Sequence, residues 1–278
     1  MAQILLRLVI SLLLLQLSGC GSLFYWPEQG LRGTPDQIGL TYEDVHLVSK
    51  DGTKLHGWLL PTRDSEQPLG MIFFLHGNAE NISTHFFALN WITRHGWEVF
   101  ILDYRGFGLS EGQPGIAGVH QDAYAGLKWA LQRAEQQNLP LVLLGQSIGA
   151  TTAATLMSVA PEADQLAGVV LDSPFSGYRR IAREKLSESW LTWVFQYPLS
   201  WTISDRHSPE RYIHQRPAVP LLIMHSCGDQ VIPCQHGQRL YQLAAEPRFY
   251  LQDEDAAHIR MLAQLNWRHE LLQWLQQL

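Results

Sequence analysis

The sequence lacks the patterns that mark several large classes of protein. Its 278 residues include only three cysteines and no C-x-x-C pair, so no cysteine-based metal site is indicated. It also has no P-loop, internal repeat, low-complexity tract or basic patch, and its formal net charge is −6. We therefore expect neither a metal site nor a nucleic-acid partner.

Long hydrophobic runs are also missing, and the apolar stretch Leu8–Leu17 is short for a permanent membrane-spanning helix. One positive charge, Arg7, precedes it, and the small residues Ser18 and Gly19 follow. This order is typical of a secretory signal, so we predict a signal peptide over residues 1–19. The alternative is an uncleaved membrane anchor.

The end of this segment, Leu17-Ser18-Gly19-Cys20, closely resembles the lipobox of bacterial lipoproteins. The resemblance implies that Cys20 is lipidated and becomes the first mature residue, with residues 20–40 as a tether. Several acyl chains on one residue would anchor the chain stably to a membrane. The residue after Cys20 is Gly21 and not Asp. The resemblance therefore points to the outer membrane of a Gram-negative cell, with the protein facing the periplasm.

The most informative feature is the G-x-S-x-G segment Gly145-Gln146-Ser147-Ile148-Gly149. An apolar run, Leu141–Leu144, precedes it, and the small-residue helical pattern Ala150–Met157 follows. A strand that turns sharply into a helix exposes the hydroxyl of the corner residue, and glycines are needed where a Cβ would clash. This context predicts that Ser147 is a nucleophile.

A serine nucleophile needs a histidine base and a carboxylate that orients the histidine, and this architecture places them in the order Ser, acid, His. Asp229 follows the apolar run Pro220–His225, and His258 follows the last such run, Arg248–Leu251. We predict Asp229 as the acid and His258 as the base. Asp172, which ends the preceding apolar run, is the alternative acid.

The oxyanion of an acyl-transfer reaction needs two converging backbone N–H groups. Ile148, directly after the nucleophile, is expected to supply one. The second is expected from Asn78, in the loop that follows the apolar run Met71–Leu75.

From residue 71 onward, strand-like runs alternate with helical patterns, which favours an α/β domain with a mostly parallel sheet. The helical patterns cover residues 82–94, 116–137, 148–159, 235–245 and 259–275. We predict one domain over residues 41–278, with a helical cap insert over about 175–216.

Four segments together resemble the α/β-hydrolase superfamily and, more narrowly, the Bem46-like serine hydrolases. They are Leu75–Asn81, Leu102–Gly112, Gly145–Gly149 and Asp229–Pro233. The resemblance spans roughly residues 40–278. It implies the α/β-hydrolase fold, the roles given above to Ser147, Asp229, His258, Asn78 and Ile148, and a structural role for Asp103–Arg105. Relatives of this kind include depalmitoylating thioesterases and lysophospholipases.

The remaining two cysteines, Cys227 and Cys234, bracket Asp229. In an oxidising compartment they could form a disulfide that fixes the loop of the acid; the alternative is two buried thiols.

The cap insert is unusually aromatic, and an apolar cap over a serine suits an acyl chain, although the same residues could simply pack the cap onto the core. The start of the insert is basic, with Arg179, Arg180, Arg183 and Lys185, which could face anionic headgroups or be a solvated helix face.

We therefore predict a serine hydrolase that cleaves esters or thioesters of apolar acyl substrates through an acyl-enzyme and requires no metal or organic cofactor. The alternatives are an aminopeptidase-like or amidase activity, for which Glu184 and Glu188 are the candidate amine-binding carboxylates, and a non-catalytic envelope lipoprotein.

Overall fold

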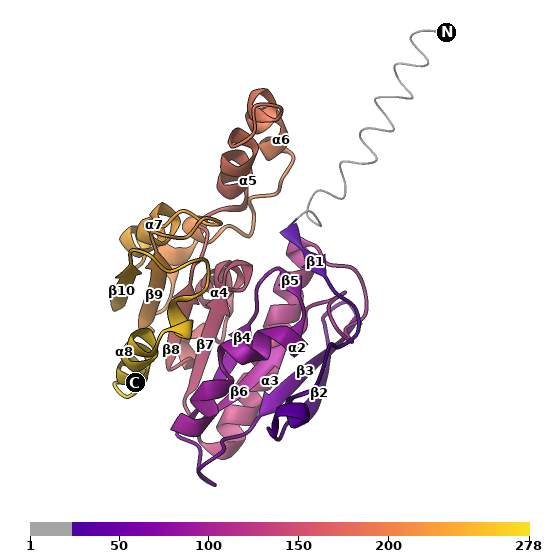
Figure 1. Cartoon of the computed structure of the whole chain (residues 1–278), viewed down its shortest axis with the longest axis vertical. Helices are drawn as coiled ribbons and strands as arrows, with labels where there is room; N and C mark the ends of the chain where they lie inside the picture. The colour runs from indigo at the N-terminus through magenta and orange to yellow at the C-terminus, as the bar shows by residue number, and fades with distance from the viewer. Residues whose placement is uncertain (1–23) are drawn as a thin grey trace.

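The computed structural model describes residues 24–278, so the predictions made for residues 1–23, Cys20 included, lie outside it. A central sheet with helices on both faces organises this part of the chain (Figure 1). Its eight strands, in spatial order, are β10 (Arg248–Asp253), β9 (Leu221–Ser226), β8 (Gly168–Asp172), β7 (Leu141–Gln146), β4 (Gly70–Leu75), β6 (Trp97–Leu102), β3 (Lys54–Leu60) and β2 (Glu43–Val48). Only β3 runs against the others.

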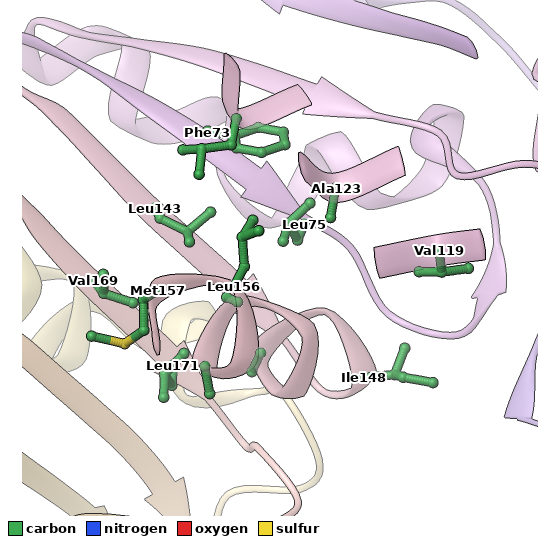
Figure 2. Close-up of a cluster of buried hydrophobic side chains, with 14 of the residues drawn as sticks. Phe73, Leu75, Val119, Ala123, Leu143, Ile148, Leu156, Met157, Val169 and Leu171 are labelled. Atoms are coloured by element: carbon green, nitrogen blue, oxygen red, sulfur yellow. The ribbon is translucent and has the colours of Figure 1, made fainter. Parts of the chain in front are cut away.

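The strands of the sheet centre are buried at every position, and most of their residues are apolar, because helices cover both faces. Along β4, Phe73 and Leu75 belong to one core cluster, whereas Ile72 and Phe74 belong to the other. The helices that pack on the first face include α3 (Ile116–Gln137), α4 (Ile148–Val159) and α7 (Gln235–Leu243), and α8 (Leu265–Leu275) packs on the second. Figure 2 shows the first cluster, with Ala123 of α3 beside Leu75 of β4. The predicted α/β architecture is confirmed.

Two of the predicted helices differ from the structure. The pattern over residues 82–94 forms a short helix α2 (Ile82–His85) followed by the 3-10 segments Phe86–Ala88 and Asn90–His95. The pattern over residues 259–275 becomes helical only at Leu265, after a 3-10 turn. In both stretches the apolar spacing is maintained by tight turns rather than by a continuous α-helix.

The strand-to-helix corner has the geometry that its sequence predicts. Ser147 lies between β7 and α4 with φ 57° and ψ −121°, a conformation that costs a non-glycine residue about 1–3 kcal/mol. A Cβ on Gly145 would lie 2.4 Å from the carbonyl oxygen of Gly149, and a Cβ on Gly149 would lie 2.1 Å from that of Leu75. Both glycines are therefore required by close backbone packing.

The stretch over residues 24–40 differs from the predicted tether, because it packs on the domain. Strand β1 (Trp26–Pro27) pairs in parallel with β5 (Ala79–Glu80), and Tyr25 is buried. A single 3-10 turn, Pro35–Ile38, follows. Aromatic side chains at the start of this stretch give it enough apolar surface to bind the core.

The cap insert over residues 175–216 contains α5 (Tyr178–Ser187) and α6 (Gln196–Trp201), which project from the body at the end where the described chain begins (Figure 1). Within residues 24–278, no helix is both long and apolar enough to cross a membrane.

Replacing Gly149 by Ala is expected to lower the free energy of unfolding by at least about 2 kcal/mol, because the new methyl group meets a backbone oxygen that cannot move independently. Urea unfolding measures the change. Gly115→Ala is the matched control, since a Cβ at Gly115 has no neighbour within 4 Å, and it is expected to cost less than about 1 kcal/mol. Equal losses in the two variants would contradict the close-packing argument.

Candidate active site

The structure brings Ser147, His258 and Asp229 into one hydrogen-bonded chain. Asp229 lies in the loop after β9, and His258 lies in the loop after β10. The Nδ1 atom of His258 is 2.7 Å from Oδ2 of Asp229, and its Nε2 atom is 2.9 Å from Oγ of Ser147. An ionised carboxylate only accepts hydrogen bonds, so Nδ1 carries the proton and Nε2 is free to accept the hydroxyl proton of Ser147.

The Asp229 carboxylate is held in its charged form. Burial raises its pKa, but the hydrogen bond from His258 and those from the backbone N–H groups of Ile232 and Val231 outweigh burial, and the net pKa is lowered. The two backbone donors lie 2.8 and 2.9 Å from Oδ1. This leaves Oδ2 to orient His258.

A second histidine, His225, lies beside the same carboxylate, with Nε2 3.7 Å from Oδ2 of Asp229. Burial lowers the pKa of His225 to about 4, and its Nε2 atom is 3.0 Å from the carbonyl oxygen of Ile232. His225 is therefore neutral at pH 7 and does not offset the charge of Asp229.

The alternative acid, Asp172, is bound elsewhere. It ends β8, and its Oδ2 atom accepts a hydrogen bond from the Gln146 side chain at 2.8 Å, while Oδ1 accepts one from Ser173 at 3.2 Å. Burial raises its pKa to about 6. Asp172 therefore supports the strand-to-helix corner at Ser147 through Gln146. It does not orient the catalytic candidate His258, which is hydrogen-bonded to Asp229.

Asn78, Ser147 and Ile148 line one cavity. Ile148 is the first residue of α4, so its N–H has no acceptor within the helix. It lies at the helix N-terminus, where negative charge is favoured. Asn78 precedes β5, and its carbonyl oxygen is occupied by the N–H of Trp26 at 2.8 Å. The backbone of Gly77, the neighbour of Asn78, lies next to Ser147: a Cβ built on Gly77 would be 3.9 Å from the Cβ of Ser147.

The loop that carries Asn78 is fixed from below by buried polar groups. Asp103 accepts the N–H of Ile82 at 2.9 Å, and the Tyr104 hydroxyl donates to the carbonyl oxygen of His76 at 3.0 Å. The ring of His76 stacks on that of His85, at a centroid distance of 4.9 Å. These contacts are the structural role expected of the stretch that begins at Asp103.

The cavity at Ser147 has a volume of about 510 Å³ and is lined mainly by apolar side chains. Ile148 and Ile232 line it from the body, and Phe175, Leu186 and Leu199 line it from the cap insert. Phe24 and Trp26 add a wall from the N-terminal stretch, which the sequence analysis did not anticipate. No carboxylate is among the described residues that line this cavity.

A hydrogen bond between side chains of α5 and α7 joins the cap to the body. The Nε2 atom of His236, on α7, is 2.7 Å from Oε2 of Glu184 on α5, and Nδ1 accepts the N–H of Ser176 at 3.1 Å. Glu188 pairs with Lys185 at 2.7 Å. The two carboxylates considered for binding an amine are thus engaged with other side chains, and neither lines the cavity, although Lys185 does.

Cys227 and Cys234 are joined in a disulfide, with Cα atoms 4.9 Å apart. The bridge closes the loop that contains Asp229, Val231 and Ile232. Among residues 24–278, no group of three or more His, Cys, Asp or Glu side chains is placed to hold a metal ion.

Replacing Asp103 by Asn is expected to change how stability depends on pH. Burial raises the pKa of Asp103 from 3.8 to about 7, so between these values the folded protein keeps a proton that the unfolded chain releases. This contribution stabilises the fold at low pH and is lost as the pH rises towards 7. The variant lacks it, so its unfolding free energy relative to wild type should increase by about 2–4 kcal/mol from pH 4 to pH 7.

Urea unfolding of both proteins at several pH values gives this difference. The variant must be compared with wild type at each pH, because other groups also change the stability over this range. Burial lowers the pKa of His76, His85 and His225 to about 4, which makes the unfolding free energy of both proteins rise from pH 4 to pH 7. Asp64→Asn, at an exposed position, is the control and should give a constant offset. A constant offset for Asp103→Asn would overturn the explanation.

Residues 66–217 match the family model described as serine aminopeptidase, S33. The uncharacterized protein YfhR of Escherichia coli K12 is 35% identical over 85% of this chain and 79% of its own length. Protein bem46 of Schizosaccharomyces pombe is 24% identical over 72% of this chain and 64% of its own. Among solved structures, the Pyrococcus furiosus esterase Pf2001 superposes with a TM-score of 0.71 at 22% identity, covering 91% of this chain and 97% of the esterase.

A soluble variant of the Saccharomyces cerevisiae monoglyceride lipase superposes with a TM-score of 0.66 at 16% identity, again over 91% of this chain and 97% of the lipase. Likenesses at these identities show the fold alone. The family model and the 35% identity to YfhR carry the assignment further: the chain belongs to the serine aminopeptidase S33 family of α/β-hydrolases.

Proposed function

We propose that the protein is a serine hydrolase that cleaves carboxylic esters or thioesters of apolar acyl groups. The observation that carries the proposal is the hydrogen-bonded chain from Asp229 through His258 to Ser147, which ends at an apolar cavity of about 510 Å³. Cavities of this size bind small molecules, and an apolar lining favours a hydrocarbon chain over a charged group.

In the first step, His258 accepts the proton of Ser147 as Oγ attacks the acyl carbonyl carbon. The negative charge that develops on the carbonyl oxygen is stabilised by the N–H groups of Ile148 and Asn78. Asp229 stabilises the imidazolium and keeps its ring oriented. His258 then protonates the leaving alcohol or thiol, which departs as the acyl-enzyme forms.

In the second step, His258 activates a water molecule, which attacks the acyl-enzyme. The tetrahedral intermediate collapses, the acid leaves, and Ser147 recovers its proton. No step needs a cofactor.

The absence of a carboxylate from the described lining of the cavity weighs against a site for a substrate amine, since a buried ammonium group needs a partner of opposite charge. Of the two carboxylates named for this role, Glu184 is bound to His236 and Glu188 to Lys185. An ester or thioester with an apolar acyl chain therefore fits the site better than a peptide amine.

We also propose that the protein is a lipoprotein, with residues 1–19 removed and Cys20 acylated in the outer membrane. Support comes from the sequence Leu17-Ser18-Gly19-Cys20 and the short apolar segment before it.

Hydrolysis of p-nitrophenyl esters of increasing acyl length tests the proposed reaction. Ser147→Ala should lower kcat by about 10⁶ and Asp229→Asn by about 10⁴, since each removes a group that acts in the transition state. Asp172→Asn is the matched control at the alternative acid and should change kcat less than tenfold. The rate should rise with acyl length up to the capacity of the cavity.

A loss in Asp172→Asn equal to that in Asp229→Asn would reassign the acid. Equal rates in wild type and Ser147→Ala, together with no covalent labelling of Ser147 by a fluorophosphonate, would reject the serine-hydrolase proposal.

Cys20→Ala is expected to abolish incorporation of an alkyne-tagged palmitate into the chain in a Gram-negative host, because the acylated thiol is missing. Ser22→Ala is the control and should be labelled like wild type. Gel fluorescence after click labelling gives the readout. A wild-type chain that carries no label and retains residues 1–19 by intact mass would show an uncleaved anchor instead.

A further inference from the structure

The cap carries an exposed apolar surface that the proposed reaction does not use. Six side chains within residues 190–201 form this surface, which we call the cap face: Trp190, Leu191, Trp193, Val194, Phe195 and Trp201. Each exposes at least half of its area, and Trp190 exposes 83%. The three indoles alone present on the order of 400 Å² of accessible surface. Soluble proteins rarely expose more than a few hundred square ångströms of contiguous apolar surface without an interaction partner.

This surface answers the question left open by the sequence, which was whether the aromatic residues of the insert merely pack the cap onto the core. Leu186 and Leu199 do face the cavity, but the cap face is turned outward. Tryptophan is enriched where proteins meet the boundary between water and lipid, since its ring is apolar and its N–H is polar.

The cap face also adjoins the route to Ser147. Helix α6 contributes Leu199 to the cavity lining and Trp201 to the exposed surface. Trp26, which lines the cavity from the N-terminal stretch, is itself 66% exposed. A hydrocarbon layer against this end of the molecule would therefore be continuous with the apolar cavity.

The position of the N-terminal stretch identifies the partner. Phe24, the first described residue, lines the cavity, and α5 and α6 project at the same end of the molecule as β1 (Figure 1). Cys20, the proposed lipidation site, precedes Phe24 by four residues, which span at most about 14 Å. A lipid on Cys20 would hold this end of the molecule next to the bilayer.

Three of the four basic side chains of α5 are paired or stacked, and the fourth, Arg179, donates to the backbone carbonyl oxygens of Ile203 and Trp201. Lys185 pairs with Glu188, Arg180 lies 3.3 Å from Glu210, and Arg183 lies over the ring of Tyr197. Arg179 and Arg183 have no carboxylate partner among the described residues and would add attraction to anionic headgroups, whereas on a zwitterionic bilayer apolar insertion is the dominant contribution.

We propose that the cap face inserts into the interfacial layer of a lipid bilayer and places the mouth of the cavity at the membrane surface, so that acyl substrates enter from the lipid phase. The orientation rests on the proposed acylation of Cys20, and the entry of substrate rests on the proposed hydrolase function. The exposed cap face is observed independently of both proposals, whereas the acylation of Cys20 is what identifies the bilayer as its partner.

Tryptophan quenching by brominated phosphatidylcholine tests the proposal. All ten tryptophans lie within the described residues. The full chain, carrying Ser147→Ala so that turnover plays no part, is reconstituted in zwitterionic vesicles. We expect strong quenching, reduced at least threefold in W190F/W193F/W201F and retained in W129F, whose indole packs against Phe100.

A second pair of variants separates apolar insertion from mere proximity without removing any fluorophore. L191S/V194S/F195S should lower the quenching at least threefold. L265S/V159S/F87S changes the same three residue types at comparably exposed positions on α8, at the end of α4 and in the 3-10 segment Phe86–Ala88, and it should leave quenching unchanged. Far-ultraviolet circular dichroism verifies that each variant is folded.

The proposal is overturned if the full chain is not quenched or if both Ser variants are quenched as strongly as the parent. Equal losses in the two Ser variants would also overturn it, because the cap face would then not be the inserted surface. Quenching is independent of hydrolysis, so failure here is distinguishable from failure of the serine-hydrolase proposal.

With Ser147 restored, L191S/V194S/F195S should hydrolyse a long-chain ester embedded in vesicles at least fivefold more slowly. Its rate on water-soluble p-nitrophenyl butyrate should stay within twofold of wild type. Equal slowing on both substrates would refute substrate entry from the lipid phase.

Discussion

The arrangement of the site depends on one steric constraint, the contact between the backbone of α4 and the ends of β4 and β7. Without side chains at Gly145 and Gly149, the helix approaches the carbonyl oxygen of Leu75 closely enough to force Ser147 into a positive φ. The same approach directs the N-terminus of α4, with the N–H of Ile148, toward the cavity. The strained serine and one proposed oxyanion donor thus have a single cause.

A second layer of buried polar groups supports this corner on both sides. Asp172 accepts a hydrogen bond from the Gln146 side chain beneath Ser147, and Asp103 accepts one from the N–H of Ile82 beneath the loop of Asn78. Burial raises the pKa of both carboxyls, to about 6 and about 7. The carboxyl beside His258 is treated differently, since its hydrogen bonds lower its pKa. The fold therefore distinguishes structural carboxyls, which tolerate a proton, from the one that orients the histidine.

The sequence predicts those parts of the molecule that depend on local chemistry and chain order. The corner at Ser147 could be predicted because two glycines, an apolar strand and a small-residue helix lie within a few residues of one another. The sequence favours Asp229 over Asp172 as the acid, but both follow strands, so only the tertiary structure shows which of the two is hydrogen-bonded to His258. The wall formed by Phe24 and Trp26 was missed because it depends on a two-residue strand pair more than fifty residues apart. The break in the helical pattern after His85 was also missed, since 3-10 turns keep a similar apolar spacing.

The pairing of β1 with β5 has a mechanical consequence. It ties Trp26, six residues after Cys20, to the backbone of Asn78 through the N–H of Trp26, so only a few residues of chain separate the proposed anchor from the loop of Asn78. A flexible tether would let an enzyme search a wide volume of the periplasm. If Cys20 is acylated as proposed, this attachment would instead set a fixed working height above the membrane, so that substrates carried by the same leaflet would come within range and those on distant surfaces would not.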